Sequence, residues 1–257
     1  MHPDNLRYHI RMCRENLGEL PFGVNVPLMY PQIEQLMQIL VEEQVKIVFT
    51  SAGSPKKWTP YLKEHGITVC HVVSSALFAE KCEQAGVDAI VAEGFEAGGH
   101  NGREETTTLC LIPRVRQATS LPLIAAGGIA IKCQIEAVKA LGAEGVQIGT
   151  RFALSQESSA HRSFKEHCIN LGEGDTRLLL KKISPTRLAC GSLFTETVEK
   201  MENEGATKEA LQLYLGKGRA KKGIFEGEID EGEIEIGQSA SLINSIESVE
   251  QIMESLI

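Results

Sequence analysis

A histidine inside a glycine-rich segment is the feature of this sequence that most suggests chemistry. Residues 93–102 read Glu-Gly-Phe-Glu-Ala-Gly-Gly-His-Asn-Gly and directly follow an apolar run. Glycines let the backbone approach a ligand and present N–H groups to it, and a histidine can exchange protons near neutral pH. The pattern predicts that His100 is a catalytic residue at the end of a strand. The alternative is a flexible loop that carries a surface histidine.

Two later strand ends carry small residues. Gly127 and Gly128 follow the apolar run at residues 121–126, and Gly149 and Thr150 follow the run at residues 145–148. Backbone N–H groups at such positions suit phosphate oxygens. Each glycine pair alone could simply form a tight turn. Taken together, the two strand ends predict a site for a phosphorylated ligand.

A polar residue also interrupts the first apolar run. Asn25 lies within residues 22–26 and must find a hydrogen-bond partner if it is buried. A cofactor ring and nearby backbone are both suitable partners, and the spacing does not choose between them. The other histidines form no pattern typical of metal ligands, so we expect no metal site.

The elements that must position these residues alternate along the first part of the chain. Short apolar runs are separated by longer segments of helical period. The runs are apolar throughout, as expected for parallel strands covered on both faces. The six runs are residues 22–26, 45–50, 67–73, 89–92, 121–126 and 145–148.

The glycine positions favour a barrel over an open sheet. A doubly wound sheet would carry its phosphate-binding glycines after the first strand, whereas here they come late, where a (β/α)₈ barrel binds phosphate. After Arg151 the alternation stops. The sequence predicts a barrel domain over 1–154, a smaller helical substrate or lid domain over 155–235, and a helix over 236–257 that returns to the barrel. Within these, residues 155–170 are expected to be helical and 224–236 to form a loop or lid.

Composition limits the partners. The net charge of −8 offers no basic field to gather nucleic acid or an anionic membrane surface. Seven scattered cysteines form neither a disulfide framework nor a zinc pattern. No run approaches the roughly 20 apolar residues of a membrane span. We therefore expect a cytoplasmic protein.

Four blocks of the sequence resemble the nitronate monooxygenase family (2-nitropropane dioxygenases) and the related flavin-dependent enoyl-acyl-carrier-protein reductases. The blocks are residues 21–25, 92–100, 124–129 and 146–152. The resemblance implies a bound FMN, with His100 facing the flavin. It implies FMN contacts from Asn25, Glu93, Gly98, Gly99, Gly127, Gly128, Gln147, Ile148, Gly149 and Thr150.

The resemblance leaves three functions open. The first is oxidation of an alkyl nitronate by molecular oxygen to a carbonyl compound and nitrite. The second is reduction of an enoyl thioester by NAD(P)H on the same scaffold. The third is a truncated barrel without catalysis. A homodimer is compatible with each of them.

One departure from the family pattern agrees with the strand count. Family members begin with a strand that ends in Gly-Gly-Met and a second glycine-rich strand, and neither occurs here. The fold expected is a (β/α)₈ TIM barrel without its first two strands. The chain would then be a fragment or begin at an internal start, and its own activity is a separate question.

Overall fold

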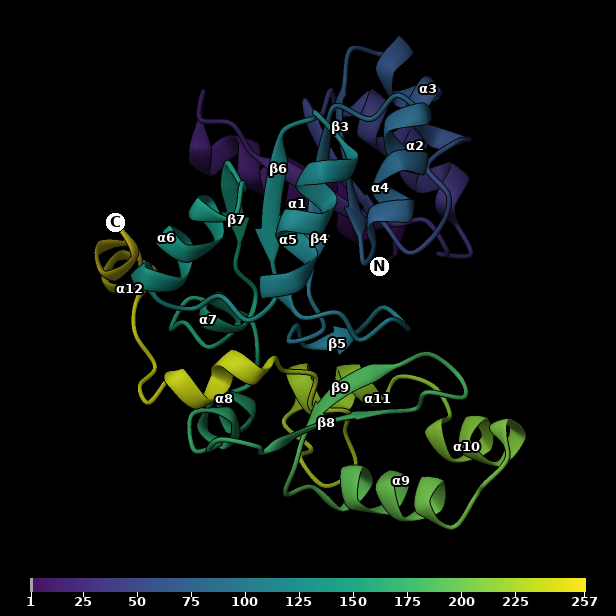
Figure 1. Cartoon of the computed structure of the whole chain (residues 1–257), viewed down its shortest axis with the longest axis vertical. Helices are drawn as coiled ribbons and strands as arrows, with labels where there is room; N and C mark the ends of the chain where they lie inside the picture. The colour runs from purple at the N-terminus through teal and green to yellow at the C-terminus, as the bar shows by residue number, and fades with distance from the viewer. Residues whose placement is uncertain (1) are drawn as a thin grey trace. The chain divides into compact units, whose positions relative to one another are not determined.

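The computed structural model describes residues 2–257 and divides into two compact units (Figure 1). The first unit comprises the chain up to Ala92 together with Arg114–Ile124. The second unit comprises Glu93–Pro113 and Ala125–Ile257. The two units are regions of dense internal contact. The domain bounds expected from the sequence stay a prediction.

All six apolar runs form strands of one sheet, so this prediction is confirmed. The sheet has the order β1-β2-β3-β4-β6-β7, and β1 to β4 pair in parallel. Its strands are β1 (Gly23–Pro27), β2 (Ile47–Ser51), β3 (Thr68–Val73), β4 (Ala89–Glu93), β6 (Leu123–Ala126) and β7 (Gly145–Gln147). Val48, Val69, Ile90 and Val91 are fully buried, which explains why these runs contain so few polar residues.

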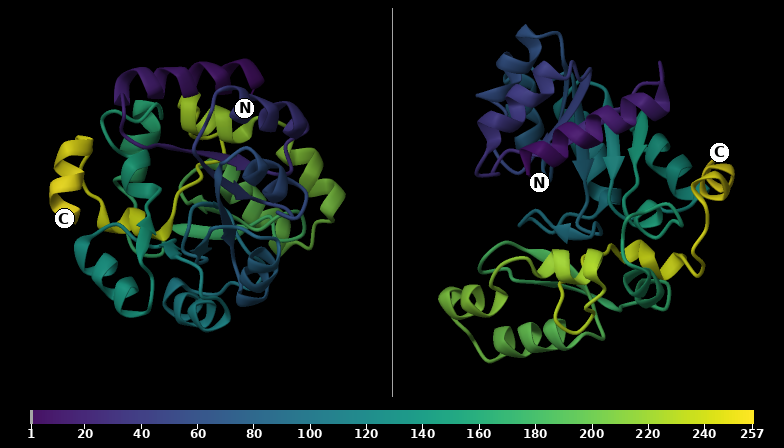
Figure 2. Two further views of the ribbon diagram at one scale, coloured as in Figure 1. Left: turned by 90° about the horizontal axis from the view of Figure 1, so that it is seen from above. Right: turned by 180° about the vertical axis from the view of Figure 1, so that it is seen from behind.

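One helix precedes the strands of the first unit and others connect them. The helices are α1 (Pro3–Leu17), α2 (Ile33–Glu42), α3 (Trp58–Glu64) and α4 (Ala76–Gln84), and α5 (Thr108–Ala118) has residues in both units. The Ser75 hydroxyl caps α4 by accepting from the Phe78 N–H. The helix α1 lies beside α2 (Figure 2) and buries Leu6 and Ile10.

Three arginines of α1 meet one carboxylate after α2. Glu43 is only 6% exposed and accepts from Arg11 Nε at 3.0 Å and from Arg7 Nη1 at 2.6 Å. Arg14 bonds the backbone oxygen of the same residue. These contacts hold α1 in place through Glu43.

The second unit contains helices and a separate antiparallel sheet of order β5-β9-β8. Its strands are β5 (Gly99–His100), β8 (Thr176–Leu179) and β9 (Thr186–Ala189). Its helices are α6 (Lys132–Ala140), α7 (Thr150–Ala153), α8 (Arg162–Cys168), α9 (Leu193–Asn203), α10 (Lys208–Leu215), α11 (Arg219–Lys221), η1 (Lys222–Glu226), η2 (Gln238–Leu242) and α12 (Val249–Leu256).

Three expectations for this region were wrong in part. The stretch 155–235 is not purely helical, because β8 and β9 lie in it. The helix expected over 155–170 begins only at Arg162, and the closing helix is limited to α12. The stretch 224–236 does not remain an open loop throughout, since Ile234 and Ile236 are buried. Short strands that carry Arg and Thr give no apolar alternation to read.

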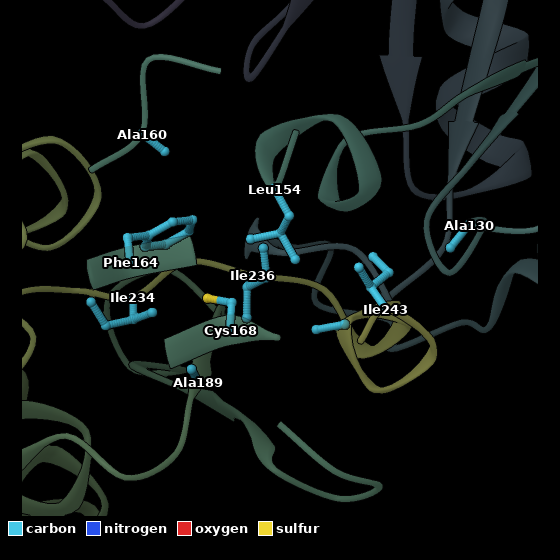
Figure 3. Packing of buried hydrophobic residues seen from close by; sticks show 10 residues of the cluster. Ala130, Leu154, Ala160, Phe164, Cys168, Ala189, Ile234, Ile236 and Ile243 are labelled. Carbon is cyan, nitrogen blue, oxygen red and sulfur yellow. The ribbon is translucent and has the colours of Figure 1, made fainter. Parts of the chain in front are cut away.

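A cluster of apolar side chains organises the second unit (Figure 3). Phe164 and Cys168 of α8 meet Ile234 and Ile236 from the late segment and Leu154 after α7. A second cluster, with Leu188 of β9, Phe194 and Val198, packs α9 against the antiparallel sheet. The first cluster fixes the segment 233–237 in place, which matters for the site below. No helix among residues 2–257 is both long enough and apolar enough to span a bilayer.

Candidate active site

A cavity of about 250 Å³ lies within the second unit, at the carboxyl ends of strands. It is lined by four separate stretches of the chain. They contribute Glu93, Ala97 and Gly98 at and after the end of β4, Ala126 to Ile129 at and after the end of β6, Gln147, Gly149, Thr150 and Ala153 from the end of β7 into α7, and Glu235, Ile236 and Ser239. Carboxyl ends of parallel strands are where barrel enzymes build their sites.

The loop after β4 is held by a buried arginine from the antiparallel sheet. Arg187 of β9 is 2% exposed and donates from Nε and Nη2 to the Phe95 carbonyl, at 3.0 and 2.8 Å. Its guanidinium also lies 4.9 Å from the centre of the Phe95 ring. A planar guanidinium with several N–H donors can bond a carbonyl and stack on a ring at the same time. The antiparallel sheet therefore positions one wall of the cavity.

A carboxylate ties the same loop to the strand end after β6. Glu96 accepts from the Thr108 N–H at 2.9 Å and from its hydroxyl at 3.1 Å. The Thr108 hydroxyl also lies 2.7 Å from the Gly127 carbonyl. Glu96 thus caps α5 and steadies the first glycine of the Gly127-Gly128 pair.

Two glycines are required by close backbone approach. A Cβ on Gly98 would lie 2.5 Å from the carbonyl carbon of Ile236. Gly127 has φ +86°, and a Cβ there would lie 2.5 Å from the Gly94 carbonyl oxygen. Both positions tolerate only glycine for reasons internal to the protein.

Gly149 differs, because nothing in the protein requires a glycine there. Its φ is −97°, and no heavy atom lies within 4 Å of the place where a Cβ would sit. Gly149 lines the cavity, so the absent side chain leaves space for a ligand. The open strand end and the neighbouring Gly128 fit a phosphorylated cofactor that contacts backbone N–H groups.

The charged residues of the cavity are acidic. Among the described residues that line it, Glu93 and Glu235 are charged and no lysine or arginine occurs. Burial raises the pKa of the Glu93 carboxyl to about 7. Burial also raises the pKa of Glu235, while the charge of His100 lowers it. The Glu93 carboxyl can therefore hold a proton near neutral pH and donate a hydrogen bond to a ligand.

His100 lies on β5, where it pairs with Thr186, and its side chain is exposed. It is not among the described residues that line the cavity. The neighbouring Gly99 has φ +72°, and a Cβ on it would lie 2.9 Å from Glu235 Oε2. Gly99 therefore makes room for the Glu235 carboxyl, which connects the cavity with the neighbourhood of His100.

A family model described as nitronate monooxygenase matches residues 1–257. This chain belongs to the nitronate monooxygenase family. The chain is 39% identical to FabK from Thermotoga maritima, with a TM-score of 0.93 over 100% of this chain and 80% of that one. The resemblance expected from the sequence is confirmed. The α/β fold with its six-stranded sheet matches this solved relative over the whole length of the present chain.

Two curated relatives match this chain over only part of their own length. The chain is 30% identical over 236 residues to a probable nitronate monooxygenase of Bacillus subtilis, covering 86% of this chain and 66% of the relative. It is 33% identical over 192 residues to a (3aS,4S,5R,7aS)-5-hydroxy-7a-methyl-1-oxo-octahydro-1H-indene-4-carboxyl-CoA dehydrogenase of Rhodococcus jostii, covering 74% of this chain and 53% of the relative. The matches span half to two thirds of these relatives.

The structure brings most of the predicted cofactor residues to one cavity. Those that line it are Glu93, Gly98, Gly127, Gly128, Gln147, Gly149 and Thr150. Gly99 and Ile148 lie next to lining residues without lining the cavity themselves. Asn25 is exposed on β1 in the first unit. The roles of these residues, and of His100, remain predictions.

Sequence reasoning missed Glu235 and Arg187. Both are far along the chain from the glycine-rich loop, and no local motif marks them. The nearest available signal was the pair of apolar residues Ile234 and Ile236 on either side of Glu235. Their alternation indicates a buried extended segment rather than a lid.

Proposed function

We propose that the protein is an FMN-dependent oxidoreductase that oxidises alkyl nitronates with molecular oxygen to a carbonyl compound and nitrite. The observation that carries the proposal is the cavity at the strand ends, with its open space beside Gly149 and its protonatable Glu93 carboxyl. Membership of the nitronate monooxygenase family supports the substrate class.

The proposed cofactor residues divide by chemistry. Backbone N–H groups around Gly128 and Gly149 would hold the FMN phosphate. Glu93 and Gln147 offer polar side chains at the ends of β4 and β7. FMN supplies the redox chemistry when bound, and the protein supplies position and electrostatics.

His100 is proposed as the group nearest the substrate. Its exposed side chain can accept a proton from a neutral nitroalkane or orient an anionic nitronate. The Arg187 contacts to the Phe95 carbonyl keep the loop before it in one conformation. Asn25, on β1 of the first unit, stays a cofactor contact predicted from the resemblance alone.

A second candidate is reduction of an enoyl thioester by NAD(P)H. The specific observation in its favour is the 39% identity to FabK over the full chain. The six strands are further proposed to be those of an eight-stranded (β/α)₈ barrel of which this chain supplies six.

Steady-state assays of purified, FMN-supplemented protein separate the two functions. We expect oxygen uptake with propionate 3-nitronate and no enoyl-thioester-dependent consumption of NAD(P)H. The reverse pattern would replace the first function by the second. Protein that binds no FMN in a fluorescence titration would refute both and leave a barrel without catalysis.

Gly149→Ala tests the cavity directly. The added methyl group meets no protein atom and the φ is ordinary, so unfolding free energy should change by less than about 0.5 kcal/mol. The methyl group would occupy ligand space, and FMN affinity should fall about tenfold or more, measured by flavin fluorescence. Gly172→Ala is the matched control, since its Cβ would meet only Asp175 Oδ2 at 3.3 Å. Equal FMN affinity in both variants would place the cofactor elsewhere.

A further inference from the structure

The late segment around Glu235 continues the edge of the antiparallel sheet that β5 begins. Gly99 of β5 pairs with Arg187 of β9, and Glu235 pairs with Leu188. Arg187 and Leu188 are consecutive residues of β9, so Gly99 and Glu235 are neighbours along one edge. The Ala189 N–H, which bonds the Ile234 carbonyl at 2.9 Å, extends the same pairing.

Glu235 lies close to Gly99 of β5 and also lines the cavity. Its Oε2 lies 2.9 Å from the position of a Cβ on Gly99, directly beside His100. The residue also lines the cavity. Glu235 therefore lines the cavity and also interacts electrostatically with His100.

Among the charged groups near Glu235, His100 is the one that lowers the pKa of the Glu235 carboxyl. Glu233, on the same segment, is a second buried carboxyl, and repulsion from Glu235 helps to raise its pKa to about 7, after burial. Arg187 lies across on β9, but its guanidinium is bonded to the Phe95 carbonyl and to the Thr176 hydroxyl. Burial raises the pKa of Glu235 and His100 opposes this rise.

We propose that Glu235 is a positioning residue whose carboxylate stabilises protonated His100, so that the pair can remove a proton from a neutral nitroalkane. The proposal rests on the proposed function. In the step, the C–H bond next to the nitro group breaks and its proton passes to the His100 imidazole. The electron pair stays on the substrate as the nitronate. The negative charge of the Glu235 carboxylate stabilises the imidazolium that forms, which favours the transfer.

The substrate preference of Glu235→Gln tests the pair. Neutral nitroethane needs deprotonation, whereas ethyl nitronate is already an anion. We expect kcat/KM for nitroethane to fall about tenfold or more, while kcat/KM for ethyl nitronate changes by less than about threefold. Glu233→Gln is the matched control and should affect both substrates equally and weakly. An equal fall in kcat/KM for both substrates in Glu235→Gln would overturn the proposal.

A titration without substrate tests the same pair independently. Carbon-13 NMR of glutamate-labelled protein, with the Glu235 signal assigned by its absence in Glu235→Gln, follows the carboxyl directly. In His100→Asn the opposing positive charge is lost, so the pKa of Glu235 should rise further. An unchanged titration would overturn the pair. If the wild-type protein oxidises neither substrate, the proposed function fails, and this titration still decides whether Glu235 and His100 are coupled.

Discussion

At the scale of single residues, the three glycines near the cavity have three different reasons to be glycine. Gly98 is packed against the Ile236 backbone, Gly99 leaves room for the Glu235 carboxyl, and Gly149 borders open space. The sequence shows the same letter at each position. Only the neighbours reveal whether the missing side chain serves the backbone, a carboxyl group or a ligand.

Gly99→Ala should distinguish the backbone strain at Gly99 from its contact with the Glu235 carboxyl. The φ of +72° penalises any side chain, and Gly205, with φ +82° and no neighbour within 4 Å, is the matched control. Both alanine variants should lose roughly 1–2 kcal/mol of unfolding free energy, measured in urea. The added methyl group in Gly99→Ala must also displace the flexible end of Glu235, so the NMR titration of Glu235 should change in this variant alone. An unchanged titration would argue against the contact.

At the scale of elements, Glu43 joins α1 to the rest of the first unit. Hydrogen bonds from Arg11, then from Arg7, lower the pKa of Glu43 to about 2 despite its burial. A depressed carboxyl pKa contributes stability above the unfolded pKa, near 4.5, and this contribution disappears as the pH falls towards 2.

Glu43→Gln should therefore be less stable than wild type at pH 7 by about 1–2 kcal/mol, allowing for solvent around the arginines. The difference should shrink as the pH falls from about 5 to 2, followed by thermal unfolding. Glu42→Gln, which removes an exposed partner of Arg7, is the control and should show a smaller effect. A gap between Glu43→Gln and wild type that is constant with pH would contradict the ion-pair explanation.

The elements that the sequence predicted well are those whose burial leaves a local pattern. Val48, Val69 and Ile90 lie in runs covered on both faces, so the parallel strands could be read directly. The strand β5 has two residues and exists because β9 pairs with it. β9 itself contains Arg187, a buried cation whose partner is a distant carbonyl. Such long-range pairings leave no periodic trace, which is why the antiparallel sheet and Glu235 were missed.

At the scale of the whole molecule, β1 ends the order of the parallel sheet. No further strand pairs with it among residues 2–257, and Gly23 and Asn25 are exposed. An unpaired strand edge can associate with other chains. We expect concentration-dependent self-association in sedimentation experiments, reduced by Val24→Lys. Leu20→Lys, which adds the same charge at an exposed residue before the strand, should leave association unchanged. Equal effects of the two variants would indicate a general charge effect instead.

The acidic lining of the cavity also affects how fast an anion can enter it. The proposed nitronate substrate or the phosphate of the proposed FMN would approach two glutamates, without an arginine or lysine among the described lining residues, on a chain of net charge −8. Dissolved ions screen this repulsion. The association rate constant should therefore rise with added salt in stopped-flow measurements, opposite to the usual behaviour of anion sites. A rate that falls with salt would reveal a cationic entrance. Ionic strength would then set how quickly the proposed anionic ligands reach the cavity.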